Sequence, residues 1–454
     1  MKYRSKILTN CLRFFRPSFG GVGGGLHKGI QMTGKFYRDE LRDIRKDSGA
    51  ILILVGALMI YPIVYAIAYK NEVVRELKTT IVDLDRTTTS HQLIKMLEGA
   101  EQIEINRVAT SLDEAKKDFF EGNSGGILVI PEDFEKDILN GKQSNVSVFA
   151  DGSYFLIYRQ LLSGSVKAVG TFSAGVEIKK LMMEGKTYNQ TVQMRDPLVA
   201  DIHYWFNPSS GYGSAMMPGI IIIILQQTLL IGIGMLGGTA KEKKQDSFLV
   251  PVALKKGGVL PILFGKSLSY LTIYAVNCVF TMIWIHSWFS YPNQGSYLTV
   301  LMLTLPFLLS VIFMGITFSV LFKRRESSIM FMVFMSPIVI FLSGVSWPAS
   351  SIPPFLYNLA HLFPSTIMIP AYLRVRSMGV GMYEIRHEYW QMLILMGFYF
   401  CTAAVALYVS ALHNAKKAKE ISILKQSQTI QSVGHPERET IFQWSQCGND
   451  MEKK

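Results

Sequence analysis

Residues 215–236 read AMMPGIIIIILQQTLLIGIGML and contain no charged side chain. A helix of about 20 apolar residues crosses about 30 Å of hydrocarbon, so this stretch can span a bilayer. Five similar apolar runs occur along the chain, at residues 49–69, 267–287, 297–321, 327–346 and 388–411. None of these runs has Asp, Glu, Lys or Arg in its middle, and none shows the polar face of a soluble core helix. The sequence therefore predicts an α-helical polytopic membrane protein with six transmembrane helices.

The segment between the first and second runs, residues 70–212, is mostly polar and alternates between strand-like and helix-like stretches. The expected strands are residues 81–85, 102–107, 126–130 and 146–151. The expected helices are residues 89–97, 132–139, 153–183 and one that begins after Ser111. Glu114 lies three positions after Ser111, which predicts a capping box. This alternation predicts an inserted α/β domain with a largely parallel sheet.

The distribution of basic residues predicts the orientation in the membrane. The net charge is +12, and its basic residues cluster before the first run and after the second, fourth and sixth. The clusters are Arg38, Arg42, Arg45 and Lys46; Lys241, Lys243 and Lys244; Lys323, Arg324 and Arg325; and Lys416, Lys417 and Lys419. The positive-inside rule therefore places both termini in the cytoplasm and residues 70–212 outside. Arg374, Arg376 and Arg386 fit this topology less well, because they fall on the predicted outer side.

The remaining segments complete the expected organisation. Residues 1–27 are basic and glycine-rich and are expected to form a flexible arm, and residues 413–454 a cytoplasmic tail. Residues 28–48 are expected to form an amphipathic helix on the inner leaflet, because Tyr37, Leu41 and Ile44 share one helical face. Residues 213–412 hold helices two to six, with a cytoplasmic loop at 237–264 and an outer hairpin at 347–387. Topology and lipid attraction account for the charge, so membrane lipid is an expected partner and nucleic acid is not.

Several kinds of site are not expected. Residues 29–35 match the first positions of a phosphate-binding loop, but Phe36 stands where a Ser or Thr must reach the metal. No strand precedes this match, so we expect no ATPase activity on this chain. The four cysteines fall in membrane or cytoplasmic segments, which argues against a disulfide framework or a metal cluster. No convincing nucleophile–base pair is visible in the spans, so an intramembrane enzyme is not expected.

The polar side chains within the runs are Gln226, Gln227, Asn277 and some hydroxyls. The first three can hydrogen-bond between helices, or they can line a transport path at a seam between subunits. Ion-coupled carriers usually place a carboxylate or histidine inside the bilayer, and these runs lack one at mid-membrane. The sequence therefore favours a transporter that is driven from elsewhere.

Six motifs, in order around the six runs, support a family resemblance. They are residues 35–50, residues 83–85, residues 128–134 with 148–153, the YWFNP of residues 204–208 followed by MPG at 217–219, residues 342–348, and residues 353–354 with 363–364. Over about residues 35–412 the chain resembles a type-2 ABC transporter permease of the subfamily with a large outer domain between its first two spans. The resemblance identifies residues 28–48 as an elbow helix, with Arg38, Glu40 and Arg42 as candidate site residues.

The resemblance also implies that residues 240–256 dock an ATPase. Lys241, Glu242, Phe248, Leu249 and Pro251 are the candidate docking residues, whereas Lys244 and residues 245–247 depart from the family pattern. Phe248 and Leu249 could seat a short amphipathic helix in a groove of a soluble partner. The alternative is a loop helix that faces lipid.

The function implied by the resemblance is that of the membrane subunit of an exporter in a bacterial cytoplasmic membrane. Its expected partners are separate ABC ATPase subunits, which hold the ATP and magnesium, and a second permease copy or a paralogue. The resemblance also allows for a periplasmic adaptor protein, and no cofactor is expected on this chain. The alternative class is a membrane receptor or tether, whose outer domain binds a partner without transport and should expose an apolar patch. An adjacent ATPase gene would favour export.

Overall fold

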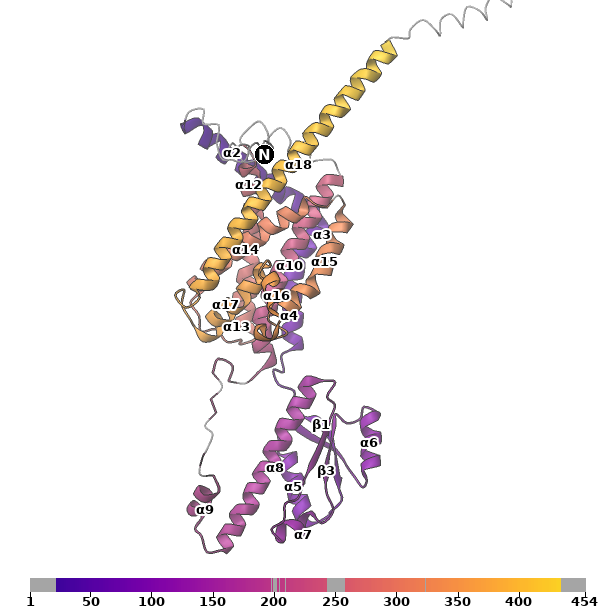
Figure 1. Cartoon of the computed structure of the whole chain (residues 1–454), viewed down its shortest axis with the longest axis vertical. Coiled ribbons are helices and arrows are strands. Elements are labelled where there is room, and N and C mark those ends of the chain that lie inside the picture. Colours follow the sequence, from indigo (N-terminus) through magenta and orange to yellow (C-terminus); the bar gives the residue numbers. More distant parts are fainter. Residues whose placement is uncertain are drawn as a thin grey trace, which may run out of the picture. The chain divides into compact units, whose positions relative to one another are not determined.

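The computed structural model describes residues 22–196, 198, 202–203, 205–208, 210–242, 258–322 and 324–433, with side chains between residues 29 and 414. The chain divides into two compact units (Figure 1). Unit 1 combines Met1–Lys70 with Gly213–Lys454, and unit 2 is Asn71–Tyr212.

Unit 1 contains six helices that are long and apolar enough to cross a membrane, within the part of the chain that the structure describes. The prediction of six spans is therefore confirmed. Their bounds are Ser48–Ala68, Tyr212–Glu242, Leu260–Trp288, Tyr297–Ser319, Arg325–Leu342 and Arg386–Asn414. The third span begins seven residues before the predicted residue 267. The helix includes Lys266 because the ammonium of that residue is paired with Glu40.

Two of the spans contain a π-helical turn. The first span consists of α3 (Ser48–Ile51), the π-helix Leu52–Gly56 and α4 (Ala57–Ala68). The third span consists of α12 (Leu260–Val279), the π-helix Phe280–Trp284 and α13 (Ile285–Trp288). The other four are α10 (Tyr212–Glu242), α14 (Tyr297–Ser319), α15 (Arg325–Leu342) and the first part of α18 (Arg386–Val433). Inserted π-turns are often found at functional positions, because they leave backbone groups free for other partners.

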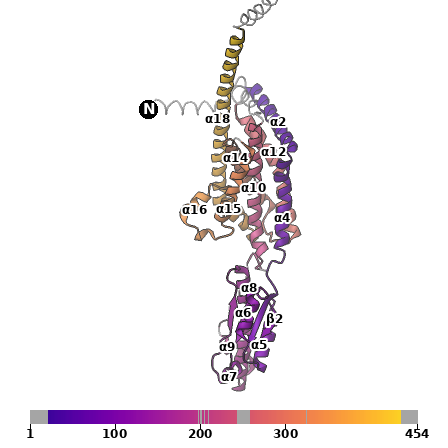
Figure 2. The same ribbon diagram turned by 90° about the vertical axis from the view of Figure 1, so that its right-hand side faces the viewer.

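Helices α10 and α14 form the centre of the bundle (Figure 2). The most apolar window of α10 is 83% buried and that of α14 is 78% buried, whereas the corresponding value for α15 is 17%. A helix that is hydrophobic all round is stable when neighbours or lipid cover every face. The central pair is covered by protein, and the peripheral spans expose apolar faces suited to lipid or to another chain.

Helix α2 (Val22–Lys46) is longer than the predicted elbow helix. Residues 22–27, assigned from the sequence to a flexible arm, are helical, because a helix held by packing extends at little cost. The line of buried residues is Phe36, Glu40 and Ile44 rather than the predicted Tyr37, Leu41 and Ile44. At the other end, α18 continues to Val433 through the first half of the predicted tail.

The hairpin between the fifth and sixth spans explains the three arginines that conflicted with the charge rule. It contains a 3-10 turn (Ala349–Ser351), α16 (Pro354–Ala360) and α17 (Pro364–Met378). Arg374 pairs with Glu388 at 2.5 Å, and Arg386 stacks on the ring of Tyr383. Arg376 is fully buried and donates to Asn293 and to the carbonyl of Met282 in the second π-turn. Each of these arginines is held by a partner within the protein, and the predicted topology stays a prediction.

Unit 2 contains a four-stranded sheet in the order β2-β1-β3-β4 (Figure 1). The strands are β1 (Leu77–Asp83), β2 (Ile103–Ala109), β3 (Gly126–Ile130) and β4 (Ser147–Ala150). Strand β1 is parallel to β2 and β3, and β4 runs antiparallel to β3. The helices are α5 (Thr88–Glu98), α6 (Leu112–Phe120), α7 (Phe134–Leu139), α8 (Phe155–Met183) and α9 (Tyr188–Arg195), of which α9 was not predicted.

The two faces of this sheet are covered by different helices. Ile81 and Leu128 point to one face and pack with residues of α5 and α8, including Leu93 and Leu161. Val82 follows Ile81 in β1, and Ile127 precedes Leu128 in β3. Both side chains point to the opposite face and pack against α6. Because side chains alternate along a strand, one sheet supplies both cores.

The predicted capping box at Ser111 is half wrong. The Ser111 hydroxyl accepts a hydrogen bond from the Glu114 N–H at 3.3 Å, as expected. The Glu114 carboxylate accepts from the Thr110 N–H at 3.0 Å instead of from Ser111, and it also pairs with Arg107. The nearby arginine draws the carboxylate away from the reciprocal bond that the sequence pattern implied.

Replacing Leu128 by Ala is expected to destabilise unit 2 by about 2–5 kcal/mol, because the side chain is fully buried and its loss leaves a cavity. Hydrogen exchange of the full chain, measured on peptides from residues 77–83, should speed up accordingly. The matched control is Leu139→Ala on α7, where the side chain is 79% exposed and little change is expected. Equal exchange in the two variants would contradict the assignment of this core.

Candidate functional site

Helix α2 lies directly against the first turns of α12 (Figure 2). A Cβ added to Gly265 would lie 2.6 Å from the Cβ of Phe36 and 2.8 Å from the carbonyl oxygen of Thr33. Glycine is therefore required for this close approach of the two backbones. The Ser269 hydroxyl donates to the carbonyl of Tyr37 at 3.0 Å, which adds a polar tie at the same contact.

Glu40 is the predicted elbow residue that holds this contact. Its side chain is buried, and its carboxylate accepts from the Lys266 ammonium at 2.8 Å and from the Tyr270 hydroxyl at 2.6 Å. A buried charge needs such partners, because removing one of them leaves the other charge buried and unpaired, which is strongly destabilising. Burial, together with the negative charge of Glu40, raises the pKa of the neighbouring Asp43.

Arg38 and Arg42, the other two elbow candidates, lie on the exposed side of α2. The Arg38 side chain donates to the carbonyl of Gly34 at 3.3 Å, and Arg42 pairs with Asp39 at 3.6 Å. Both contacts are within the helix, so these arginines contribute little to anchoring it. Their outward position leaves them available to a partner or to lipid headgroups.

A second charged contact joins the beginnings of the first and fifth spans. Two guanidinium nitrogens of Arg325 donate to the two carboxylate oxygens of Asp47, at 2.5 and 2.9 Å. Asp47 is also the N-cap of α3 and accepts from the Ala50 N–H at 3.0 Å. Partial burial alone would raise the pKa of Asp47, but the hydrogen bonds from Arg325 and Ala50 outweigh it and lower that pKa. The carboxylate is thus held in its charged form.

The end of the second span joins the same group. Arg325 reaches the Thr239 hydroxyl at 3.4 Å, and its backbone N–H donates to the Glu242 carboxylate at 2.9 Å. The Lys241 ammonium donates to the carbonyls of Ser319 and Val320 at the end of the fourth span. We call Asp47, Thr239, Lys241, Glu242 and Arg325 the junction. It connects the ends of four spans at one end of unit 1.

Three of the predicted docking residues, Phe248, Leu249 and Pro251, lie outside the described residues. The segment that contains them, residues 243–257, follows directly after Glu242 of the junction. The described chain resumes at Gly258, two residues before α12. The junction and the α2–α12 contact therefore flank the two ends of this segment.

The three predicted pathway residues are all buried within this chain. The Gln226 carbonyl oxygen accepts from the backbone N–H of Ser365 at 2.8 Å, and Asn277 donates to the carbonyl of Leu54 at 2.8 Å. Leu54 lies in the π-turn of the first span, so Asn277 binds the backbone at that irregular turn. Gln227 has side-chain atoms without a partner among the described residues. Two of the three thus bond between elements of one chain, and the pathway role stays a prediction.

Within the described residues, no group of three or more His, Cys, Asp or Glu side chains is placed to hold a metal ion. Asp47 is paired with Arg325 and Glu40 with Lys266, whereas Lys241 and Glu242 bind backbone groups of neighbouring helices. Their arrangement suits mechanical linkage between helices rather than covalent chemistry.

Comparison with known proteins identifies the family. The family model for ABC-2 family transporter proteins matches residues 49–405, which run from the second residue of the first span, through the segment between the first two spans, into the sixth span. This chain belongs to the ABC-2 transporter family. It is also similar to ABC transporter G family member 20 of Dictyostelium discoideum, with 22% identity over 284 residues. That match covers 60% of this chain but 36% of the relative, so the chain spans little more than a third of that protein's length.

The sequence of this ABC-2 chain points to Lys241 and Glu242 as docking residues but does not single out Asp47 or Thr239. Arg325 is, in the sequence, only one of several basic residues after the fourth run. One local signal was available for Asp47, since an aspartate followed by a small residue before an apolar run is a common N-cap. No local signal pairs Asp47 with Arg325, because 278 positions separate them in the chain.

Exchanging the charges tests the Asp47–Arg325 pair. Asp47→Arg and Arg325→Asp should each lower the thermal stability of the detergent-solubilised chain, because each leaves like charges facing one another. The double variant should recover part of the loss. A charge-assisted pair of this kind is worth about 1.5–3 kcal/mol.

The control for the charge exchange is Arg42→Asp, in an exposed pair that should contribute at most about 1 kcal/mol. A double variant less stable than both single variants would show that the two side chains do not act as a pair.

Proposed function

We propose that this chain is the permease subunit of an ABC exporter and works with separate ATPase subunits that bind ATP and magnesium. The membership of the ABC-2 family supports a membrane transport component. The direction of transport and the separate ATPase are inferences from the predicted topology and from the docking segment. In this proposal the chain lies in a bacterial cytoplasmic membrane, with both termini in the cytoplasm and unit 2 outside.

The junction is the observation that carries this proposal. Residues 243–257 continue from Glu242, which is bonded to the first residue of α15. Arg325 in turn holds Asp47 at the base of the first span, and Lys241 holds the end of α14. A displacement of the docking segment would therefore act on several spans at once. Discrete packing of this kind converts a local push into rigid-body movement.

The α2–α12 contact supplies a second point of transmission. An ATPase that closes on ATP would move residues 243–257 and the exposed face of α2 together. Since Glu40, Lys266 and Tyr270 bind α2 to α12, the third span would follow. Transport is coupled to this movement provided that the cargo binds one of the two states more tightly than the other. A second copy of the chain, or a paralogue, would complete the pathway, and a periplasmic adaptor is a further candidate partner.

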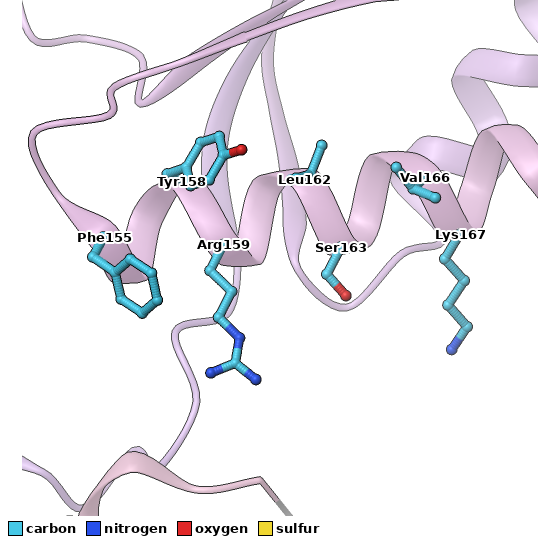
Figure 3. A pocket seen from close by; sticks show the side chains of 7 residues that line it. All are labelled: Phe155, Tyr158, Arg159, Leu162, Ser163, Val166 and Lys167. Atoms are coloured by element: carbon cyan, nitrogen blue, oxygen red, sulfur yellow. The ribbon is translucent and has the colours of Figure 1, made fainter. Parts of the chain in front are cut away.

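A second candidate function, that of a membrane receptor or tether, also has an observation in its favour. An open groove runs along α8 in unit 2 and is lined by Phe155, Tyr158, Leu162 and Val166 beside Arg159 and Lys167 (Figure 3). Phe155 is 68% exposed and Val166 is 62% exposed. This is the kind of apolar patch that a receptor or tether would need. Purification of the native complex separates the two functions, because an exporter should retain an ATPase and a tether should not.

The predicted topology is tested by labelling Ser153→Cys in a chain whose own cysteines have been replaced. Ser153 is exposed in unit 2, so a membrane-impermeant maleimide should label it in intact spheroplasts. The control is Arg45→Cys on the exposed face of α2, which should be labelled after lysis and not before. The reverse pattern at the two sites would invert the topology and remove the basis for export.

The docking role is tested by replacing Phe248 and Leu249 together with Asp. Each apolar side chain buried in a partner groove contributes about 1.5–3 kcal/mol, and a carboxylate would add a desolvation cost. The variant should lose ATPase co-purification and export while the chain remains in the membrane. The control combines Phe120→Asp and Leu139→Asp in unit 2, whose side chains are 82% and 79% exposed. Co-purification of the ATPase should persist in this variant. Unchanged ATPase recovery in the first variant would contradict docking at this segment.

A further inference from the structure

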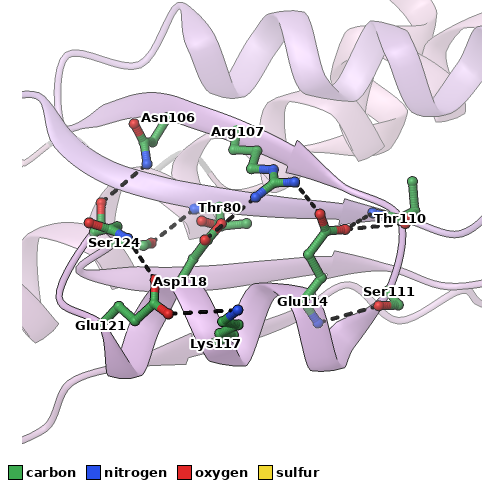
Figure 4. A network of polar contacts seen from close by, with 11 residues as sticks. Thr80, Asn106, Arg107, Thr110, Ser111, Glu114, Lys117, Asp118, Glu121 and Ser124 are labelled. Carbon is green, nitrogen blue, oxygen red and sulfur yellow. Dashed lines mark hydrogen bonds and ion pairs between the residues drawn. The ribbon is translucent and has the colours of Figure 1, made fainter.

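Unit 2 has a polar hollow on the face of the sheet that α6 covers. Its volume is about 430 Å³. Strands β1 and β2, the C-terminal end of α6 and the turn that follows it contribute its lining residues: Lys78, Asn106, Arg107, Asp118, Gly122 and Asn123. Figure 4 shows Asn106 and Arg107 on the strand side and Asp118 rising from the helix toward them. Ligand sites commonly have volumes of about 300–1,000 Å³, so a small molecule fits the space.

An irregularity in β2 builds this hollow. The register pairs Thr79 with Ile105 but Thr80 with Arg107, so Asn106 has no partner on β1. In a regular strand, neighbouring side chains point to opposite faces of the sheet. The extra residue of a bulge re-aims the strand, and such bulges are enriched beside binding sites. Here it allows both Asn106 and Arg107 to line one cavity.

The acceptor groups of the hollow are not fully used within the described part of the chain. Asp118 is 9% exposed, and its Oδ1 lies 3.6 Å from Arg107, while its buried Oδ2 has no hydrogen-bond partner there. The hydroxyl of Thr80, beside it in Figure 4, is also buried without a partner. A buried carboxylate oxygen without a donor is costly, which is the condition that a ligand donor would relieve.

The positive side of the hollow is Lys78. Its side chain is exposed, and no carboxylate of the described residues forms an ion pair with its ammonium. Arg107 differs, because it is engaged by Glu114 and Asp118. Asn106 donates its amide to the carbonyl of Asn123 at 3.2 Å, so its side-chain nitrogen is used within the chain. Among the described residues, the hollow is therefore lined by a lysine without an ion-pair partner and by a carboxylate oxygen without a donor.

We infer that this hollow binds a small zwitterion of the amino-acid type. Its ammonium would pair with the carboxylate of Asp118, and its carboxylate would pair with Lys78. A simple anion would face the charge of Asp118, and a simple cation would face Lys78 and Arg107. A molecule that carries both charges can pair with Asp118 and with Lys78. Electrostatic complementarity of this kind favours such a ligand over one that brings like charges together. This inference does not rest on the proposed transport function.

The experiment is isothermal titration of the full chain in lipid nanodiscs with glycine, L-serine, acetate, methylammonium and glucose at millimolar concentrations. Glycine or L-serine should give saturable binding that is at least about tenfold tighter than that of acetate or methylammonium. Asp118→Asn and Lys78→Met should each weaken zwitterion binding at least about tenfold, since each removes one charge-assisted contact. Unchanged hydrogen exchange in unit 2 would show that the variants remain folded.

Matched controls come from the same helix. Asp113→Asn and Lys116→Met alter a carboxylate and an ammonium of α6 that pair with each other and do not line the hollow. Zwitterion binding should be unchanged in both. The inference is overturned if neither zwitterion binds the wild-type chain, if acetate, methylammonium or glucose binds as well as glycine, or if the control variants weaken binding as much as the hollow variants. The comparison among ligands on the wild-type chain stands even if a variant fails to fold.

Discussion

Asp47 and Arg325 form the contact on which the arrangement of the spans depends. The aspartate starts the first span as its helix cap, and the arginine is the first residue of the fifth. Their two-pronged hydrogen bonding fixes a geometry, and not merely a distance, between these helix ends. The backbone N–H of Arg325 also donates to the Glu242 carboxylate, so the second span is held at the same point. The beginnings of the first and fifth spans and the end of the second are thus held together around Arg325.

Close backbone contacts make this arrangement possible. A Cβ added to Gly238 would lie 2.8 Å from the backbone of Arg325, and one added to Gly265 would meet α2 at a similar distance. Without a strong hydrophobic driving force between helices in lipid, packing of small residues and hydrogen bonds supply much of the association. The same logic applies at mid-span, where Gln226 and Asn277 bind backbone groups of other elements. Charge, small residues and buried amides thus hold the bundle at successive depths.

The two units are stabilised in different ways. Unit 1 buries apolar helices around α10 and α14 and leaves its charges at the helix ends. Unit 2 builds two cores on one small sheet, with α5 and α8 on one face and α6 on the other. The bulge at Asn106 interrupts the regular pairing of β2 and opens a polar hollow at the edge of that sheet. The proposed binding site in unit 2 and the proposed transport function of unit 1 therefore lie in separate parts of one chain.

The sequence by itself determined the six spans, the inserted sheet-containing segment and the strand and helix order within most of it. These follow from hydrophobic length and from the period of the apolar residues, which are local properties. Tertiary structure alone decided the Asp47–Arg325 pair, the use of Glu40 by Lys266 and Tyr270, and the burial of Arg376 against neutral acceptors. It also decided that Glu114 turns to Thr110 and Arg107 instead of closing a capping box. The partners of Asp47, Glu40 and Arg376 are distant in the chain and come close only through folding, so no period or motif in the sequence encodes these contacts.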